Sequence, residues 1–202
     1  REALWDGFTS KLKNQLRKGE KQGFSVRWGG TDGLRDFYAV FSRNMRDLGT
    51  PVFGRRLFAS IADRFADQAE YCVLTREGQP LAAALLLHGS RVTEVPSASS
   101  LREYNSTNAN MHLYWHLLQR AIERGSEVFD FGRSSQDSGT YRFKAQWGAR
   151  PSPAIWQYHS RTGEIGEMRP ENARYRLAIR VWKRLPVWLT RLLGPPIVRG
   201  IP

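Results

Sequence analysis

A lysine surrounded by aromatic residues is the strongest candidate for chemistry in this sequence. It lies in the stretch EVFDFGRSSQDSGTYRFKAQWGARP, residues 127–151. Helical spacing places Tyr141 and Lys144 on one face, and Phe143 and Trp147 form a second pair four residues apart. Lys144 is therefore expected to hold a single ammonium group among rings. Such a group is usually either paired with a carboxylate or present because an anionic ligand binds to it.

A strand, a loop and this short helix must position Lys144. The residues Val128, Phe129 and Phe131 predict a short buried strand. The next loop collects polar and turn-forming residues, namely Gly132, Ser134, Ser135, Asp137, Ser138 and Gly139. A strand that ends in such a loop is typical of a binding site. The alternative is that Lys144 is solvated or forms an ordinary salt bridge with Asp137.

The same stretch carries a resemblance to a known family. In the strings Phe129–Ser134 (FDFGRS), Arg142–Lys144 (RFK) and Trp147–Ala149 (WGA), the chain resembles the C-terminal half of the FemAB-type aminoacyl/acyltransferases. These form a branch of the GNAT-like N-acyltransferase superfamily, and the chain is most similar to the FemAB-like proteins associated with exosortase/PEP-CTERM systems. The likeness extends over residues 4–202, and its specific part is residues 130–149. Family members usually carry two GNAT-like units in tandem, whereas this chain holds about one.

The resemblance implies an α/β, GNAT-like fold with a mixed, mostly antiparallel central sheet flanked by helices. It implies transfer of an aminoacyl or acyl group from an activated donor, aminoacyl-tRNA or a thioester, to an amine of a cell-envelope or exopolysaccharide-related acceptor. The donor is a co-substrate, so no bound cofactor is expected. Acetyl-CoA-using members normally carry an Arg/Gln-x-x-Gly-x-Gly/Ala pyrophosphate loop, which we do not find here, and this favours aminoacyl-tRNA over acyl-CoA.

The resemblance also assigns roles to individual residues. Lys144 becomes the catalytic residue, stabilising negative charge on the donor phosphate or on the tetrahedral oxyanion. The substrate-binding residues on this stretch become Arg133, Ser134, Asp137, Tyr141, Phe143 and Trp147. Asp130 is expected to orient Arg133 or a backbone turn, with a role as general base as the alternative. Amide formation of this kind needs no covalent enzyme intermediate, so no Ser/His/Asp or Cys/His group is required.

A polar loop before a helix provides a second candidate site. Residues 97–110 (SASSLREYNSTNAN) precede an apolar helix that starts near Met111. Unpaired N–H groups and the positive end of the helix dipole suit a phosphate or an oxyanion, so Asn108 is a candidate binding residue. It could equally cap the helix. His112 and His116 have a spacing that two zinc ligands could share, but no third ligand is evident, and no metal site is predicted.

Periodicity predicts the other elements. Helices are expected over 34–48 and 55–65, and strands over 24–28, 70–76, 81–88, 91–98 and 154–159. The unbroken apolar run at 81–87 indicates a central strand covered on both faces. Cys72, the one cysteine, excludes an internal disulfide and is expected to be a buried strand residue.

The basic segments at both ends suggest how the chain is divided. We expect a basic inter-domain helix at 1–22, a GNAT-like domain at 23–168 and a basic amphipathic helical tail at 169–202. Because the chain starts at Arg1 without an initiator Met, an N-terminal GNAT-like half is expected to precede it. No apolar run approaches twenty residues, which predicts a cytoplasmic protein, with peripheral contact at the inner membrane face through the C-terminal helix as one interpretation and packing on the domain as the other.

The formal net charge of +12 indicates an anionic partner but does not identify it. The candidates are an acyl donor that includes tRNA, an anionic acceptor substrate and an acidic membrane surface. Two alternatives to a FemAB-type enzyme therefore remain open. One is an acyl-CoA-dependent GNAT acetyltransferase, and the other is a non-catalytic, anion- or nucleic-acid-binding half of a tandem protein.

Overall fold

The computed structural model describes residues 1–155, 157, 159 and 173–199. The helices are α1 (Glu2–Asp6), α2 (Ser10–Glu20), α3 (Leu34–Leu48), α4 (Arg55–Arg64), α5 (Ala109–Glu123), α6 (Gly139–Ala145), α7 (Ala173–Trp182) and α8 (Val187–Val198). The strands are β1 (Ser25–Gly29), β2 (Ala69–Arg76), β3 (Gln79–His88), β4 (Val92–Ser100) and β5 (Val128–Asp130). Short 3-10 turns at Thr31–Gly33 and Arg102–Thr107 precede α3 and α5.

The five strands form one sheet in sequence order, β1-β2-β3-β4-β5. The first three pairings are antiparallel, and β5 joins β4 in parallel. The expectation of a mixed, mostly antiparallel sheet flanked by helices is confirmed. The prediction of a buried fifth strand is wrong, because Val128 and Asp130 are exposed. In the described part of the chain β5 has β4 alone beside it, so one of its sides lacks a neighbour.

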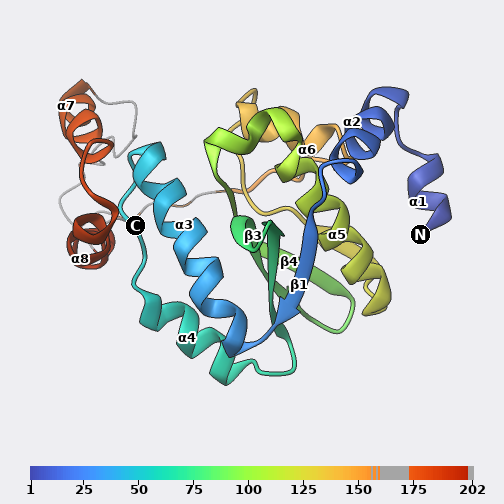
Figure 1. Ribbon diagram of the computed structural model, residues 1–202, viewed down its shortest axis with the longest axis horizontal. Coiled ribbons are helices and arrows are strands. Elements are labelled where there is room, and N and C mark those ends of the chain that lie inside the picture. The colour runs from blue at the N-terminus through green and yellow to red at the C-terminus, as the bar shows by residue number, and fades with distance from the viewer. Residues whose placement is uncertain (156, 158, 160–172, 200–202) are drawn as a thin grey trace.

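Successive side chains of the central strands point to opposite faces of the sheet, and a hydrophobic core lies on each face. Tyr71 and Val73 point to the face covered by α3 and α4, whereas Cys72 and Leu74 point to the face covered by α2 and α5. Strand β3 alternates in the same way, which explains its unbroken apolar run, since a strand covered on both sides needs apolar residues at every position. Figure 1 shows this three-layer arrangement, with α3 and α4 on one side of the sheet and α2 and α5 on the other.

The N-terminal segment forms two helices, whereas its continuous row of apolar residues predicted one helix over 1–22. Helix α1 ends at Asp6, with Gly7 as its C-cap, and Thr9 caps α2 by accepting a hydrogen bond from the backbone N–H of Leu12 at 3.3 Å. A threonine cap supplies the partner that the first turn of a helix lacks, so it favours a new start at this point. The apolar stripe of α2 is buried against α5 through Leu12 and Leu16.

The C-terminal segment also forms two helices, α7 and α8. None of the helices in the described ranges is long and apolar enough to cross a bilayer. The predicted strand at 154–159 includes residues 156 and 158, which lie outside the described residues. The division of the chain at residues 22 and 168 stays a prediction.

A tight approach between Gly33 and Tyr71 gives a test of this packing. A Cβ added at Gly33 would lie 2.8 Å from the Cβ of Tyr71, which is fully buried and donates its hydroxyl to the Phe58 carbonyl. We expect Gly33→Ala to lower the free energy of unfolding by about 1–3 kcal/mol, because neither backbone can move apart freely. Chemical denaturation measures the change.

Gly139→Ala is the matched control, since a Cβ there meets nothing within 4 Å and the backbone φ is not positive. It should leave stability unchanged within about 0.5 kcal/mol. Equal stability of the two variants would contradict the close packing of α3 on β2.

Candidate functional site

Strands β4 and β5 separate shortly after they meet, and this fork is the centre of the candidate site. They pair at only three positions, Val92 with Val128, Thr93 with Phe129 and Glu94 with Asp130. The register between β3 and β4 then shifts, so that Val95 and Pro96 together stand opposite Leu86. This is a β-bulge, which bends a strand and redirects the residues after it. Beyond it, β4 continues to Ser100 with no strand on its β5 side in the described part, leaving backbone groups for a ligand.

The loop after β5 is held by short local contacts. A carboxylate oxygen of Asp130 accepts a hydrogen bond from the backbone N–H of Gly132 at 2.7 Å. Gly132 has φ +70°, a conformation that glycine adopts without steric cost. Ser138 then caps α6 by accepting from the N–H of Tyr141 at 3.1 Å. The expectation that Asp130 orients a backbone turn is confirmed.

Lys144 connects α6 back to this turn. Its Nζ donates hydrogen bonds to the carbonyl oxygens of Gly132 and Arg133, both at 2.8 Å. Burial lowers the pKa of Lys144, and the negative charge of Asp130 partly opposes this effect. The amine is therefore partly buried at the mouth of the loop. Two of its three N–H groups are used, and one remains for a further acceptor.

The aromatic residues of the motif belong to the core beneath this loop. Phe143 meets Tyr114 edge to face with ring centroids 4.8 Å apart, and Tyr114 stacks on Phe131 at 5.8 Å. Trp147 is only 5% exposed and packs against Phe8 at 5.6 Å. Trp147 can therefore support the site from below but presents almost no surface to a substrate. The site also rests on a residue outside the motif, Tyr114 of α5.

The other predicted site residues lie along the same loop. Ser134 has a buried hydroxyl with no hydrogen-bond partner among the described residues. Asp137 is exposed with φ +60°, and its carbonyl accepts from Arg142 at 3.1 Å. Arg133 supplies one of the two carbonyls that Lys144 binds, and Tyr141 is half-buried in the first turn of α6.

Asn108 stands immediately before α5 in the left-handed conformation, with φ +59°. Its side chain makes no capping hydrogen bond, and its carbonyl accepts the first helical bond from the N–H of His112 at 2.9 Å. The three N–H groups before that point have no partner within the helix. Of the two roles considered for Asn108, side-chain capping is not observed, and binding stays a prediction.

The pairing of β4 with β5 identifies a further candidate carboxylate that no sequence motif marks. Glu94 stands opposite Asp130 where the fork opens, and residues at paired positions project to the same face of a sheet. Two exposed carboxylates thus lie side by side at the fork. The sequence alone gives no sign of this, because the residues are 36 positions apart and only the parallel register brings them together.

The two histidines of α5 line a cavity that none of the predicted substrate-binding residues reaches. A cavity of about 320 Å³ is lined by His112, His116 and Glu20, among others, and a second cavity of about 260 Å³ is lined by Phe65, His88 and Glu94, among others. None of the substrate-binding residues predicted from the sequence lines either cavity.

The Nε2 atoms of His112 and His116 lie 3.1 Å apart. Burial lowers the pKa of both, that of His116 to about 4, so both rings are neutral at pH 7 and one donates to the other. Within the described ranges no three His, Cys, Asp or Glu side chains converge as metal ligands.

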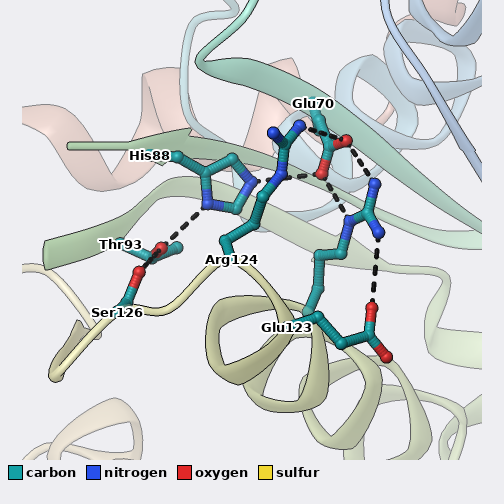
Figure 2. Close-up of polar contacts among 7 residues, drawn as sticks. Glu70, His88, Thr93, Glu123, Arg124 and Ser126 are labelled. Atoms are coloured by element: carbon teal, nitrogen blue, oxygen red, sulfur yellow. Dashed lines mark hydrogen bonds and ion pairs between the residues drawn. The ribbon is translucent and has the colours of Figure 1, made fainter. Parts of the chain in front are cut away.

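A charged cluster that the sequence did not suggest fixes the C-terminal half of α5 to the sheet (Figure 2). Glu70 of β2 accepts hydrogen bonds from Arg120 at 2.5 and 2.7 Å and from Arg124 at 2.7 Å. His88 of β3 lies 3.1 Å from the same carboxylate, and its other ring nitrogen is 2.8 Å from Thr93. The cluster spans β2, β3, β4 and α5, and its contacts are mutually satisfied, so its role is structural.

Known proteins share this architecture. The sequence matches the family described as Acetyltransferase (GNAT) domain over residues 7–145. No curated protein sequence matches the chain. Among solved structures, FemX is similar with a TM-score of 0.66 and 16% identity, over 73% of this chain and 55% of FemX, so the chain spans about half of that protein.

Two aminoglycoside N-acetyltransferases are also similar. They are AAC(6')-Iy in complex with CoA (TM-score 0.54, 12% identity, 68% of this chain and 95% of that one) and AAC(6')-Ih from Acinetobacter baumannii (TM-score 0.53, 13% identity, 71% and 100%). At these identities the similarity establishes the fold, and it confirms the expected GNAT-like architecture.

The Glu70 cluster predicts how stability depends on pH. Burial alone would raise the pKa of Glu70, but hydrogen bonds from Arg120 and Arg124 lower it to about 2. A depressed pKa in the folded state gives stability that is present above the unfolded value and is lost as the pH falls through the folded one. Between about pH 4.5 and pH 2, the protein should lose on the order of 3 kcal/mol of unfolding free energy through this group.

Glu70→Gln should lower the free energy of unfolding at pH 7 by about 3 kcal/mol, because it leaves two arginines without their buried partner. It should also flatten the acid limb of the stability curve. Urea denaturation across pH measures both effects. Glu77→Gln, at an exposed residue of the β2–β3 turn, is the control and should behave as the wild type. An unchanged acid limb in Glu70→Gln would contradict the assignment.

Proposed function

The chain belongs to the acetyltransferase (GNAT) domain family, and from this premise we propose that it is an N-acyltransferase of the FemAB type. It transfers an aminoacyl or acyl group to an amine of a cell-envelope or exopolysaccharide-related acceptor. The observation that supports the proposal best is the fork between β4 and β5. The N-terminus of α5 follows one branch of the fork, and the loop bound by Lys144 follows the other.

The acyl donor that we favour is an aminoacyl-tRNA. The net charge of +12 suits a polyanionic donor, and the N-terminus of α5 suits one of its phosphate groups. The sequence before α5, Leu101–Asn108, reads LREYNSTN and contains no glycine. A pyrophosphate-binding loop for CoA would usually need glycine there, so that the backbone can approach the phosphates closely.

The chemistry requires orientation and charge stabilisation more than a nucleophilic side chain. The neutral acceptor amine attacks the donor carbonyl, an N–C bond forms and the carbonyl oxygen becomes an oxyanion. Collapse of this intermediate breaks the C–O bond to the tRNA ribose, or the C–S bond of a thioester, and leaves an amide. In the described part of the chain, the backbone N–H groups along the edge of β4 and the remaining N–H of Lys144 are the donors available to the oxyanion.

The attacking nitrogen must also lose a proton. Glu94 and Asp130 are the carboxylates at the fork, and either can accept that proton directly or through water. Asp130 already accepts a hydrogen bond from Gly132, so one of its oxygens is engaged in shaping the turn. The Glu94 carboxylate is exposed and has no such role in the turn, and it is therefore the better candidate for the base.

Lys144 serves the site in two ways. Its two bonds to the Gly132 and Arg133 carbonyls fix the loop that faces the fork. Its ammonium group places a positive charge at the same point, where negative charge develops on the donor. The predicted substrate-binding residues Arg133, Ser134 and Asp137 lie on the loop that these bonds hold.

A donor assay tests the proposal. The protein is incubated with radiolabelled acetyl-CoA or with tRNA carrying a labelled amino acid, together with amine-containing cell-envelope precursors. Label should pass from the charged tRNA to an amine. Transfer from acetyl-CoA alone would replace the FemAB assignment with an acyl-CoA-dependent acetyltransferase. Salt-sensitive tRNA binding without transfer from any donor would instead indicate a non-catalytic, nucleic-acid-binding protein.

Lys144→Ala tests the role of the lysine. We expect the variant to lose roughly a hundredfold in kcat/KM, because one preorganised electrostatic donor is usually worth that much. Its fold should remain, since the side chain is at the surface of the domain and only partly buried. Steady-state kinetics and circular dichroism provide the two measurements.

Lys18→Ala, at an exposed lysine of α2, serves as the control and should keep full activity. Wild-type turnover in Lys144→Ala would reject both roles of Lys144 and leave the fork as the only basis for the proposal.

A further inference from the structure

The two C-terminal helices carry positive charge without any compensating negative charge. Residues 173–199 contain no Asp or Glu. They contain seven basic residues, namely Arg174, Arg176, Arg180, Lys183, Arg184, Arg191 and Arg199. This segment therefore supplies a large share of the +12 net charge of the chain. Such a segment attracts an anionic surface and repels another copy of itself.

The same helices expose large apolar side chains in helical rows. Leu177 and Val181, four residues apart on α7, are 67% and 52% exposed. Trp188 and Leu192, four apart on α8, are 66% and 65% exposed. Apolar rows at this spacing normally face a core. Here both rows face outward in the part of the chain that the structure describes.

These side chains are exposed even though both segments contact the rest of the domain. A Cβ added at Gly194 of α8 would lie 2.7 Å from the backbone nitrogen of Val52, so the two backbones already touch closely. Arg191 donates from Nε at 2.8 Å to the hydroxyl of Ser42, a buried residue of α3. Arg46 donates to the carbonyl of Leu185 at 3.2 Å. The inward faces are thus occupied, and the exposed rows lie outside these contacts.

Figure 1 shows where these two helices lie. Helices α7 and α8 occupy one end of the long axis, beyond α3, whereas α1 and α2 occupy the other end. Along α7 and the turn after it, Arg176, Arg180 and Arg184 follow one another at four-residue spacing. Arg180 and Arg184 stand three positions after Leu177 and Val181, a spacing that makes side chains neighbours on a helix. A basic row therefore runs directly beside an apolar row.

We propose that α7 and α8 dock on the surface of an anionic lipid bilayer. In this proposal the side chains of Leu177, Val181, Trp188 and Leu192 enter the interface between headgroups and acyl chains, where Trp is favoured. The arginine row beside them contacts the negatively charged headgroups. A second copy of the chain would oppose cations with cations, whereas the bilayer supplies negative charge and apolar depth together.

Vesicle co-sedimentation of the full chain tests this proposal. The protein should bind vesicles of phosphatidylcholine mixed with phosphatidylglycerol and bind vesicles of phosphatidylcholine alone at least about tenfold more weakly. The variant W188A/L192A should lose about tenfold in binding to the mixed vesicles, because less apolar surface enters the interface. The variant R176E/R180E/R184E should lose at least about a hundredfold, since each basic residue near the surface is worth about fivefold.

Matched controls distinguish docking through α7 and α8 from the effect of losing positive charge or apolar surface elsewhere on the protein. K11E/K18E/K21E changes the same number of exposed charges on and beside α2, and L57A/F65A removes two exposed apolar side chains near α4. Both should bind within about threefold of the wild type. Circular dichroism checks the fold of every variant.

Three outcomes would overturn the proposal. They are equal binding to uncharged vesicles, an equal loss in the α2 variant, and a loss of self-association rather than of vesicle binding in W188A/L192A. The last, seen by analytical ultracentrifugation, would assign the surface to a second copy of the chain.

Discussion

The separation of β5 from β4 after three paired residues is the constraint on which the rest of the structure depends. A parallel pair forms only if the chain crosses over between its strands, and α5 makes that crossover. The crossover places the start of α5 after the far end of β4 and brings the chain back through β5 into the loop that Lys144 binds. The point where β4 and β5 separate therefore brings together the edge of β4, the N-terminus of α5 and the ammonium group of Lys144.

The two hydrophobic cores hold the central strands together, so in the described part of the chain the sheet separates only between β4 and β5. On one side of the sheet α3 and α4 cover β2 and β3, and on the other side α2 and α5 cover the same strands. The Glu70 cluster adds a polar clamp towards the C-terminal end of α5, away from its start. A rigid helix held at that end can present its N-terminus in a fixed position, as binding without induced rearrangement requires.

Sequence patterns predicted much of this fold. The amphipathic helix α3 was located to the residue, and the three meander strands were located to within two residues, because strong periodicity and tight turns define such elements. The break at Gly7–Thr9 and the exposure of β5 were missed. The helix break depends on a threonine cap that interrupts an otherwise continuous row of apolar residues. The exposure of β5 depends on which strands lie beside it.

The candidate site was predicted only in its local part. The turn at Asp130 and the helical spacing of Lys144 depend on neighbouring residues, and the sequence contains the information for them. The Ser138 cap is equally local but was not predicted. That Glu94 would stand beside Asp130 and that Trp147 would be buried depend on strand register and on packing against Phe8 and Tyr114. Those contacts join segments that no local pattern relates.

The β-bulge at Val95 and Pro96 has a consequence for solubility. A bulge breaks the regular spacing of backbone groups along its strand, and Pro96 has no amide hydrogen to offer to a partner strand. Another chain therefore cannot add a full-length strand along this edge as it could along an uninterrupted one. The protein can keep a strand edge accessible to small molecules while resisting the edge-to-edge aggregation that such accessibility usually invites.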